Sequence, residues 1–435
     1  MADAAIVSAE LDRFRSSSAA RVAPVFGTAH IRRALVTMGD PQDRIPPAIH
    51  LTGTNGKGST GAFIRAMAEA AGLKVHAFTS PHLTRVNERI RVAGKLVEDA
   101  ELADVLADIW RRTEQLTYFE ALTTAAFCLF AHHRADLSII EVGAGGATDA
   151  TNVMTRPAAC AVTPISRDHE AMFGISGVAA IARVKAGIFR EGVPAIIADQ
   201  PAIALGVLRE EARTVGAKVL ESGDDWQARW EGDAFVYEGR SLSVRSPWLG
   251  LRGQHQAQNA GAACAVLEAI NDPCIRSEHM AAGLREATWP ARLQKLKPGP
   301  LAKDHDVWID AAHNPGGAAT LARAIGQAKQ DGGRAALVFA IQGVKDVEGV
   351  LGELVRVAGE IIVCPLPDSG GQEGGPGADP AHVAGIARTL GADVSEAETL
   401  ERAVAHAQEN ASRIYVCGSV YLCGAALMAN GEAIE

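Results

Sequence analysis

Short apolar segments alternate with segments of helical periodicity along most of this chain, and this alternation limits the fold more than any other feature. The pattern predicts a strand at Pro47–Thr52, a helix at Ser59–Ala71 and a strand at Leu73–Thr79. Further strands are predicted at Leu137–Val142, Ala158–Ile165 and Val193–Asp199, with helices at Phe119–His133 and Gly177–Arg190. Strands that alternate with helices form parallel sheets with helices on both faces. The sequence therefore predicts an α/β protein.

A second series of strands follows the segment Pro298-Gly299-Pro300, which is typical of a linker. These strands are predicted at Asp306–Asp310, Ala335–Ala340, Glu360–Pro365 and Arg413–Cys417. Because 435 residues exceed one ordinary hydrophobic core, we predict two domains, residues 1–296 with a mostly parallel sheet and residues 297–435 with a Rossmann-like α/β fold. Trp226–Ser246 alternates with a period of two instead, which predicts an antiparallel hairpin around Glu238-Gly239.

Charge and cysteine usage narrow the partners and the compartment. The net charge is −9 and no long basic run occurs, so we expect neither a nucleic-acid nor a membrane partner. No uncharged apolar run approaches the length of a membrane span, and the first residues do not resemble a signal peptide. The seven cysteines include no CxxC pair and are odd in number, which indicates reduced thiols and a cytoplasmic location.

The segment His50-Leu51-Thr52-Gly53-Thr54-Asn55-Gly56-Lys57-Gly58-Ser59-Thr60 leads from a predicted strand through glycines into a predicted helix. Glycines let successive backbone N–H groups point inward, and the helix N-terminus attracts anions. Lys57 supplies a charge for nucleotide phosphates, and the Ser59 hydroxyl is a candidate ligand for Mg²⁺. The strict GxxxxGK[ST] spacing is not met, and the alternative is an ordinary glycine-rich turn. We predict nucleotide binding, and hence a P-loop-type first domain.

Glu141 directly follows the apolar run Leu137-Ser138-Ile139-Ile140 of a predicted strand, at the end of the strand where parallel sheets hold their ligands. Mg²⁺ bound to ATP takes oxygen ligands, usually one or two carboxylates with water. The alternative for Glu141 is a cap on the following turn. We predict that it binds the metal.

The motifs GTNGKGST and TSPHLTRVNERIRVAG, taken together, resemble the signature of folylpolyglutamate and dihydrofolate synthases within the Mur ligase superfamily. The resemblance continues in the same order through TYFEALT, EVGAGGATDATNV, DHEAMFG, KAGIFR, GQHQAQNA, PARLQ, DAAHNP and CGSVYLCG. It covers nearly the whole chain. It implies an ATP-dependent ligase that activates a pterin-containing carboxylate as an acyl phosphate and joins it to L-glutamate.

The resemblance also implies roles for individual residues. ATP would contact Thr54, Asn55, Gly56, Lys57, Gly58, Ser59, Thr60, Asn259, Arg292 and Asp310. Two Mg²⁺ ions would be bound by Ser59, Ser80, Glu141 and His169. Dihydropteroate or a reduced folate would contact Thr117, Tyr118, Phe119, Glu120, Thr148, Asp149 and Ala150, and glutamate would lie near His313 and Ser419. Lys57, Lys185 and His313 would take part in catalysis, and such ligases are commonly monomers.

Lys185 matches a lysine that this family carries as a carbamate, which would support the second metal ion. The alternative is an unmodified lysine that extends to solvent. Ala147 stands where the family pattern GGRxDATN has arginine, and Arg167 occupies a normally apolar position. These departures concern the second substrate, and the residues do not distinguish dihydropteroate from a folate.

Two other functions stay open at this point. One is a Mur-type ligase that adds an amino acid to a UDP-sugar substrate, although its phosphate loop usually ends GKT. The other is a nucleotide-binding regulatory protein without ligase activity.

Overall fold

The computed structural model describes residues 2–16, 27–113, 116–168, 170–328, 335–367 and 375–434. The chain forms two compact units. The first comprises Met1–Ile165, His169–Gly250 and Gln256–Thr288, and the second Ser166–Asp168, Leu251–His255 and Trp289–Glu435. The second unit thus already includes Trp289, and a division into domains at residues 296 and 297 stays a prediction. His169, expected to bind metal, lies outside the described residues.

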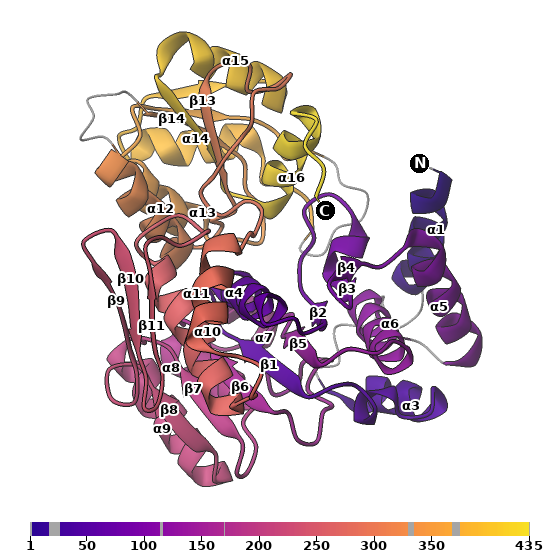
Figure 1. Ribbon diagram of the computed structural model, residues 1–435. Coiled ribbons are helices and arrows are strands. Elements are labelled where there is room, and N and C mark those ends of the chain that lie inside the picture. Colours follow the sequence, from indigo (N-terminus) through magenta and orange to yellow (C-terminus); the bar gives the residue numbers. More distant parts are fainter. Residues whose placement is uncertain are drawn as a thin grey trace. The chain divides into compact units, whose positions relative to one another are not determined.

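An eight-stranded sheet forms the centre of the first unit (Figure 1), with the order β4-β3-β2-β5-β1-β6-β7-β8. The strands are β1 (Ala48–Thr52), β2 (Val75–Phe78), β3 (Ile90–Val92), β4 (Lys95–Leu96), β5 (Leu137–Glu141), β6 (Ala159–Val162), β7 (Pro194–Ile197) and β8 (Lys218–Glu221). All neighbours pair in parallel except β2 with β3 and β3 with β4. The predicted mostly parallel sheet is confirmed, and β1 lies inside it, between β5 and β6.

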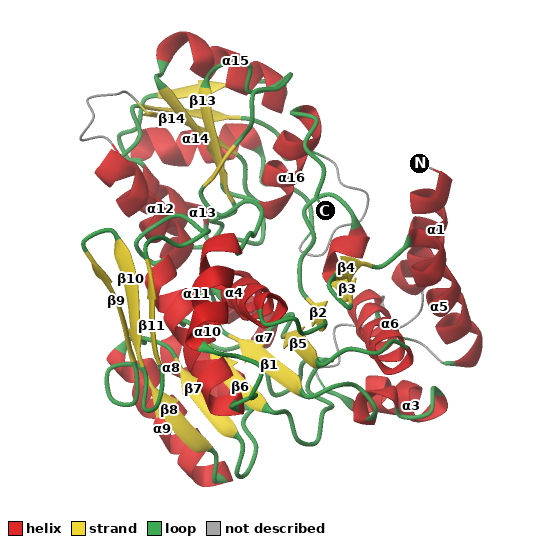
Figure 2. Ribbon diagram, in the orientation of Figure 1, coloured by secondary structure: helices red, strands yellow, loops and turns green. Residues whose placement is uncertain are grey.

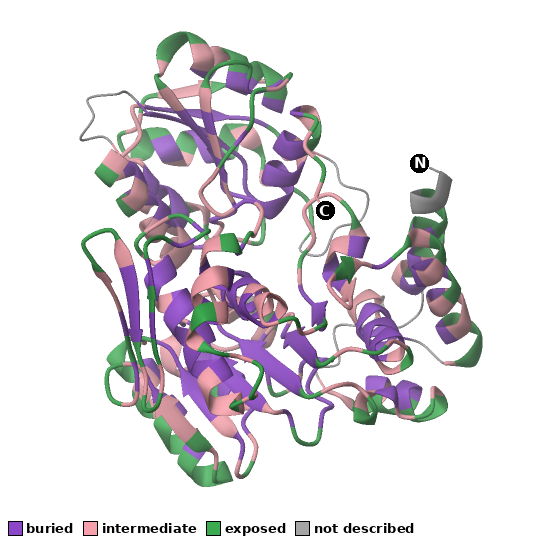
Figure 3. Ribbon diagram, viewed as in Figure 1, coloured by how far each residue is buried: buried purple, intermediate pink, exposed green. Residues whose placement is uncertain are grey.

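Helices cover both faces of this sheet (Figure 2), as the alternation of strands and helices predicts. The helices are α1 (Ala2–Ser16), α3 (Ala29–Thr37), α4 (Lys57–Ala70), α5 (Asp99–Arg112), α6 (Tyr118–His132), α7 (Glu170–Phe173), α8 (Val178–Ala186), α9 (Ala202–Val215), α10 (Gln256–Ile270) and α11 (Ser277–Glu286), with short 3₁₀ helices at Pro41–Asp43 and Val86–Arg89. Helix α4 packs with α10 and α11. The central strands beneath are almost entirely buried (Figure 3), so both faces contribute to the core.

A separate three-stranded sheet corrects one prediction. Trp226–Ser246 was expected to form a single hairpin, but it forms β9 (Gln227–Glu231), β10 (Ala234–Glu238) and β11 (Ser243–Ser246), paired in the order β11-β10-β9. The additional turn follows Glu231 and includes Gly232, whose φ is +61°. The period of two is the same in all three strands, so periodicity alone did not reveal this turn.

The second unit has a six-stranded sheet with the order β12-β13-β17-β14-β15-β16. Its elements are β12 (Gln294–Lys295), β13 (Asp306–Asp310), α12 (Pro315–Ala328), β14 (Ala335–Phe339), α13 (Val347–Leu354), β15 (Glu360–Val363), α14 (Pro380–Thr389), β16 (Val394–Glu396), α15 (Leu400–Asn410), β17 (Arg413–Cys417) and α16 (Val420–Ala429). Only β12 is antiparallel to its neighbour among these described strands. The predicted Rossmann-like α/β character is therefore confirmed for this unit.

All seven cysteines are free thiols. Five are buried, Cys128 is half-buried, and Cys274, in the connection between α10 and α11, is exposed. Within the described ranges, no helix combines the length and the apolar character that crossing a membrane requires.

Candidate active site

The loop between β1 and α4 is held tightly by the segment that follows β6. Gly53 has a φ of +145°, and a Cβ atom there would overlap the Thr163 side chain. The backbone N–H groups of Thr54 and Asn55 both donate to the carbonyl of Pro164, at 3.1 and 3.2 Å. The loop is therefore fixed at its start, and only glycine fits at position 53.

The end of the same loop is fixed by α10. Gly56 caps α4 with a φ of +90°, and a Cβ atom on it would overlap the Asn259 side chain. Asn259 is buried and donates to Gln256 Oε1 at 2.9 Å. Asn259, which the resemblance assigns to ATP from the distant segment GQHQAQNA, thus lies directly against the phosphate loop. The shape and the glycines are those of an anion-binding loop at a helix N-terminus.

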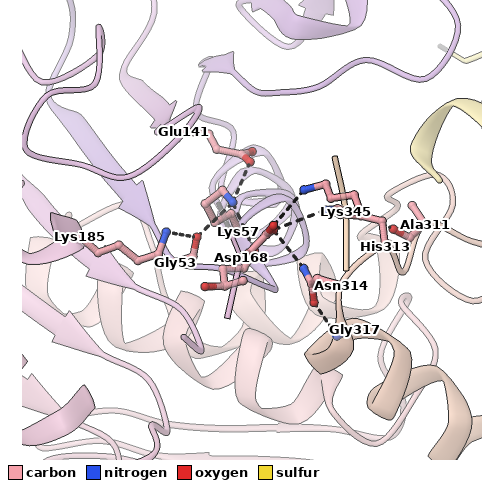
Figure 4. A network of polar contacts seen from close by, with 11 residues as sticks. Gly53, Lys57, Glu141, Asp168, Lys185, Ala311, His313, Asn314, Gly317 and Lys345 are labelled. Atoms are coloured by element: carbon pink, nitrogen blue, oxygen red, sulfur yellow. Dashed lines mark hydrogen bonds and ion pairs between the residues drawn. The ribbon is translucent and has the colours of Figure 1, made fainter. Parts of the chain in front are cut away.

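Lys57 and Glu141 lie together in this loop region (Figure 4). Lys57 Nζ donates to the carbonyls of Gly53 and Thr54, at 3.2 and 3.4 Å, and lies 4.0 Å from Glu141 Oε1. Glu141 ends β5 in register with Leu51 of β1, and its side chain is 4% exposed. A buried carboxylate beside a phosphate loop is suited to bind a cation, because burial strengthens its attraction to positive charge.

Side-chain oxygen atoms of the kind that Mg²⁺ binds come from elements that neighbour the Glu141 strand. Ser80 follows β2, which pairs with β5, so both residues lie near the carboxyl edge of adjacent parallel strands. Ser59 is buried in the first turn of α4, and the neighbouring Thr60 hydroxyl has no hydrogen-bond partner among the described residues. Oxygen donors of this kind suit Mg²⁺. Within the described residues, no group of three His, Cys, Asp or Glu side chains is arranged for a metal.

Lys185 reaches the phosphate loop from α8. Its side chain is buried, and its Nζ donates to the carbonyl of Gly53 at 2.8 Å (Figure 4). The alternative of a lysine extending to solvent is therefore wrong. The same turn of α8 also holds the loop after β5, because the Ala147 N–H donates to the Val184 carbonyl at 2.9 Å.

Asp149 organises the loop that follows β5. Its Oδ2 accepts from the Ala144 N–H at 3.0 Å, and its Oδ1 accepts from the N–H and hydroxyl of Thr151, at 2.9 and 2.5 Å. Burial raises the pKa of the Asp149 carboxyl, and these hydrogen bonds oppose that effect. Since both oxygens are engaged within the loop, Asp149 shapes it, while the neighbouring Thr148 is partly exposed.

The motif TYFE has a structural task at the start of α6. The Thr117 N–H donates to Glu120 Oε2 at 2.8 Å, and the Glu120 N–H donates to Thr117 Oγ1 at 3.3 Å. This reciprocal pair is a capping box. Phe119 lies over the loop after β5, since a Cβ atom on Gly143 would overlap its ring. The Tyr118 ring packs against the Arg15 guanidinium, which lies 4.6 Å from the ring centre.

In the second unit, Arg292 lies between two residues in a strained conformation. Ala291 and Leu293 have φ values of +56° and +45°, which non-glycine residues rarely adopt. Asp310 stabilises this turn: its Oδ2 accepts from the Leu293 N–H at 2.8 Å, and its Oδ1 accepts from the Ala312 N–H at 3.0 Å. Desolvation raises the pKa of the Asp310 carboxyl, and the charge of Arg292 counteracts it. Asp310 therefore positions the Arg292 turn.

Three loops of the second unit bring polar groups together around Asp168. Lys345 Nζ pairs with Asp168 Oδ1 at 2.9 Å, and Asn314 Nδ2 donates to Asp168 Oδ2 at 3.3 Å (Figure 4). His313 Nε2 lies 3.8 Å from the same carboxylate, and its Nδ1 lies 2.9 Å from the Ala311 carbonyl. The local pattern did not single out Lys345 or Asp168, although Lys345 follows a predicted strand at its carboxyl end.

Ser419 follows β17 at the carboxyl edge of the second sheet, but its hydroxyl serves α16. It caps the helix by accepting from the Tyr421 N–H at 3.2 Å and is 2% exposed. The preceding Gly418 N–H donates to the Ala312 carbonyl at 3.1 Å, which ties this loop to the one that carries His313. The structure thus brings the His313 loop and the Ser419 loop together.

Two family descriptions match the chain. The Mur ligase middle domain matches residues 51–267, and the dihydrofolate synthetase C-terminal domain matches residues 301–429. The dihydrofolate synthase/folylpolyglutamate synthase of Bacillus subtilis is 33% identical over 350 residues, which cover 76% of this chain and 79% of that protein.

A longer relative is the probable bifunctional folylpolyglutamate synthase/dihydropteroate synthase of Haloferax volcanii, 33% identical over 419 residues. The match covers 91% of this chain and 47% of the relative, so the chain spans about half the length of that protein.

Two solved structures have folds similar to that of this chain over nearly its whole length. E. coli FolC in complex with DHPP and ADP has a TM-score of 0.86 at 27% identity, with 97% of each chain covered. A bifunctional folylpolyglutamate synthase/dihydrofolate synthase with Mn, AMPPNP and L-glutamate bound has a TM-score of 0.83 at 28% identity, again with 97% of each chain covered.

Proposed function

The chain belongs to the folylpolyglutamate synthase/dihydrofolate synthase family of Mur ligases, and we propose that it is an ATP-dependent ligase that joins L-glutamate to dihydropteroate, a reduced folate or both. The observation that carries this proposal is the phosphate loop, in which Thr163 packs against Gly53 and Asn259 packs against Gly56. Lys57 of this loop lies beside the buried Glu141. The related structures bind ADP with DHPP, and AMPPNP with Mn and L-glutamate.

Magnesium would be held by Glu141, Ser59 and Ser80, with His169 as the fourth proposed ligand. Bound there, the metal supplies positive charge for the phosphate oxygens of ATP. Lys57 already lies at the loop and has to exchange its bonds to the Gly53 and Thr54 carbonyls for bonds to phosphate. Arg292 lies in a turn that Asp310 stabilises. It suits a second phosphate contact because its planar guanidinium group donates two hydrogen bonds at once.

The reaction has two steps. The carboxylate of the pterin substrate attacks the γ-phosphorus of ATP, which gives an acyl phosphate and ADP. The glutamate amine then attacks the acyl carbon, and inorganic phosphate leaves. Lys57 stabilises the charge that spreads over the transferring phosphoryl group, and the remaining contribution of the protein is to orient reactants and exclude water.

The glutamate site is assigned to the polar groups around Asp168 in the second unit. Lys345 is 11% exposed there and offers an ammonium group to a carboxylate, while Asp168 and His313 could engage the amine. The pterin site is assigned to Thr148 and Ala150 with Phe119 and Tyr118. Thr117, Glu120, Asp149 and Ser419 support these sites through their caps and turns.

Lys185 is assigned a carbamate. Its burial and its bond to the Gly53 carbonyl place the side chain at the phosphate loop, where a negative group would offset the charge of two metal ions. A Lys185→Ala variant should be inactive, and short carboxylates added to the buffer should partly restore turnover. Equal activity of Lys185→Ala and the wild type would remove this assignment.

The enzyme is further proposed to be a cytoplasmic monomer. The seven free thiols support a reducing compartment, because an oxidising one favours disulfides. Light scattering at working concentration measures the oligomeric state, and a dimer there would contradict the monomer.

The function is tested by phosphate release with single omissions. Phosphate release should require ATP, Mg²⁺, a pterin acid and glutamate together, and ADP should accumulate in step with the glutamylated product. Offering dihydropteroate and tetrahydrofolate separately identifies the acceptor. Phosphate release that responds to a UDP-sugar peptide, or nucleotide binding without any turnover, would contradict the proposal.

A further inference from the structure

His50 lies in the middle of β1, three residues before Gly53 of the phosphate loop, and is 1% exposed. Its Nε2 lies 2.9 Å from the Thr151 hydroxyl. Thr151 belongs to the loop after β5, which also contains Thr148 and Ala150. Burying a polar side chain in a central strand costs free energy unless the side chain is hydrogen-bonded. The contact with Thr151 supplies that hydrogen bond for His50.

The direction of the hydrogen bond follows from the partners of Thr151. Its hydroxyl has a single proton, and it donates to Asp149 Oδ1 at 2.5 Å. Toward His50 the hydroxyl oxygen can therefore only accept, and the proton between them must be on Nε2. The reverse direction would require a protonated Asp149. The three side chains are therefore linked by two consecutive hydrogen bonds, in which His50 donates to Thr151 and Thr151 donates to Asp149.

His50 stays neutral in this environment. Burial, and secondly the charge of Arg190, lower the pKa of His50 to about 3. The ring is therefore a neutral donor at any pH near neutrality, and its contact with Thr151 does not change with pH in that range.

Strand β1 holds the same loop at a second point. The Thr52 hydroxyl donates to the Gly145 carbonyl at 2.8 Å. The loop is thus attached to β1 by Thr52 near its start and by His50 near its end, and Thr148 and Ala150 lie between the two contacts. Because β1 leads directly into the phosphate loop, the strand that ends at the ATP site also fixes the backbone assigned to the pterin acid.

We propose that His50 is a positioning residue for the second substrate: by donating from Nε2 to Thr151 it fixes the Thr151–Asp149 pair, and so the backbone of residues 148–150. This rests on the proposed function, because the loop is assigned there to the pterin acid. His50 touches neither nucleotide nor acceptor in this assignment.

The test compares variants that keep or remove the donor. His50→Gln retains an N–H close to the Nε2 position, whereas His50→Asn has the same amide but is too short to reach Thr151. Thr151→Ser keeps the hydroxyl, and Thr151→Val removes it at nearly constant volume. We expect the KM for the pterin acid to rise about tenfold in His50→Asn and Thr151→Val, because losing one hydrogen bond weakens binding by about a factor of ten. His50→Gln and Thr151→Ser should stay within about twofold of the wild type.

The KM for ATP is the second readout, and it should not change in any of the four variants. A parallel rise in both KM values would indicate general damage to β1 and would overturn the proposal. So would an unchanged KM for the pterin acid in Thr151→Val, which decides the matter if His50→Asn does not fold.

The tautomer is measured independently by ¹⁵N NMR of histidine-labelled protein, with His50→Gln used to assign the signal. The proton should stay on Nε2 across about pH 5 to 8, the range in which an ordinary histidine titrates. A proton on Nδ1, or an imidazolium in that range, would contradict the hydrogen bond from His50 to Thr151. This measurement needs no turnover. A wild type without ligase activity would contradict the proposed function, and the NMR result would still decide whether His50 donates to Thr151.

Discussion

Lys57 forms bonds to its own loop that ATP has to replace. Since these bonds go to the carbonyls of Gly53 and Thr54, the lysine contributes little to the hydrophobic core. We expect Lys57→Met to lower kcat by roughly 10²–10³, the usual effect of removing one preorganised charge from a transition state. The melting temperature should change little. Steady-state kinetics and thermal unfolding on the same preparation check both statements, and near-normal kcat in the folded variant would remove the phosphate-loop argument.

Glu141 and Glu221 form a matched pair for testing the metal. Each ends a parallel strand of the same sheet and is largely buried, but Glu221 is neutralised by Arg209 at 2.6 Å, whereas Glu141 has Lys57 at 4.0 Å. Glu141→Gln should raise the Mg²⁺ concentration needed for half-maximal activity by about tenfold or more, because the charge that holds a hard cation is lost. Glu221→Gln should lower stability alone. A magnesium titration that is the same in both variants would show Glu141 to be only a strand cap.

Among single residues, the candidates that local sequence pattern predicted are those whose immediate neighbours in the sequence signal a strand end or a glycine-rich turn. Lys57 and Ser59 follow glycines at a strand-to-helix turn, and Glu141 ends an apolar strand. Asp168 and Lys345 are far apart in the sequence, and their contact depends on the tertiary fold. The bond of His50 to Thr151 is equally non-local. No periodicity or spacing signals such pairs.

At the scale of elements, helix α4 is flanked by two glycines of the same conformation but different surroundings. Gly56 has a φ of +90° and Asn259 against it, whereas Gly72 follows the helix with a φ of +84° and nothing within 4 Å of an added Cβ. Alanine at either position should cost about 1 kcal/mol of stability through backbone strain. Only Gly56→Ala should also lose ATP affinity, because the added methyl group displaces Asn259. Calorimetric titration with ADP distinguishes them, and equal affinities would show that the close approach at Gly56 is irrelevant to binding.

Most strands of the two large sheets followed from the hydrophobic periodicity, including β1, β5 and β13, and so did helices α4, α6 and α8. The short strands β3, β4, β12 and β16 did not, since two or three residues carry too little pattern and are defined by their neighbours. The four-residue strand β8, at the edge of the first sheet, was not predicted either. The motif TYFE shows a different case. Resemblance assigned Thr117 and Glu120 to the substrate, and the structure shows that both form the capping box of α6.

For the whole molecule, the second unit is assembled from separate stretches of the chain. Ser166–Asp168 and Leu251–His255 belong to it together with Trp289–Glu435. A fragment starting at Trp289 lacks Asp168 and leaves the 11% exposed Lys345 without the carboxylate that it pairs with. A buried charge that has lost its partner is strongly destabilising.

We therefore expect Lys345→Met to stabilise that fragment and to destabilise the intact chain. Urea unfolding of both forms measures the two signs. The exposed Arg402–Glu398 pair provides a neutral control, because Arg402→Met should change neither form by more than about 0.5 kcal/mol. The same sign of change for Lys345→Met in both forms would contradict the role of Asp168. No sequence pattern signals this assembly, because a linker pattern marks where a chain can bend and not which segments pack together.

The distribution of the thiols has a practical consequence for measurement. Burial raises the pKa of Cys128 to about 11 and that of Cys160 to about 12, so these groups are almost entirely protonated and unreactive at neutral pH. Cys274 is exposed on the connection between α10 and α11. A maleimide dye at neutral pH should therefore attach at one place on the native protein. Helix α10 carries Asn259, which lies against the phosphate loop, in its first turn, and Cys274 follows the other end of this helix. A fluorophore can therefore be attached to the native chain without altering any residue of the candidate site.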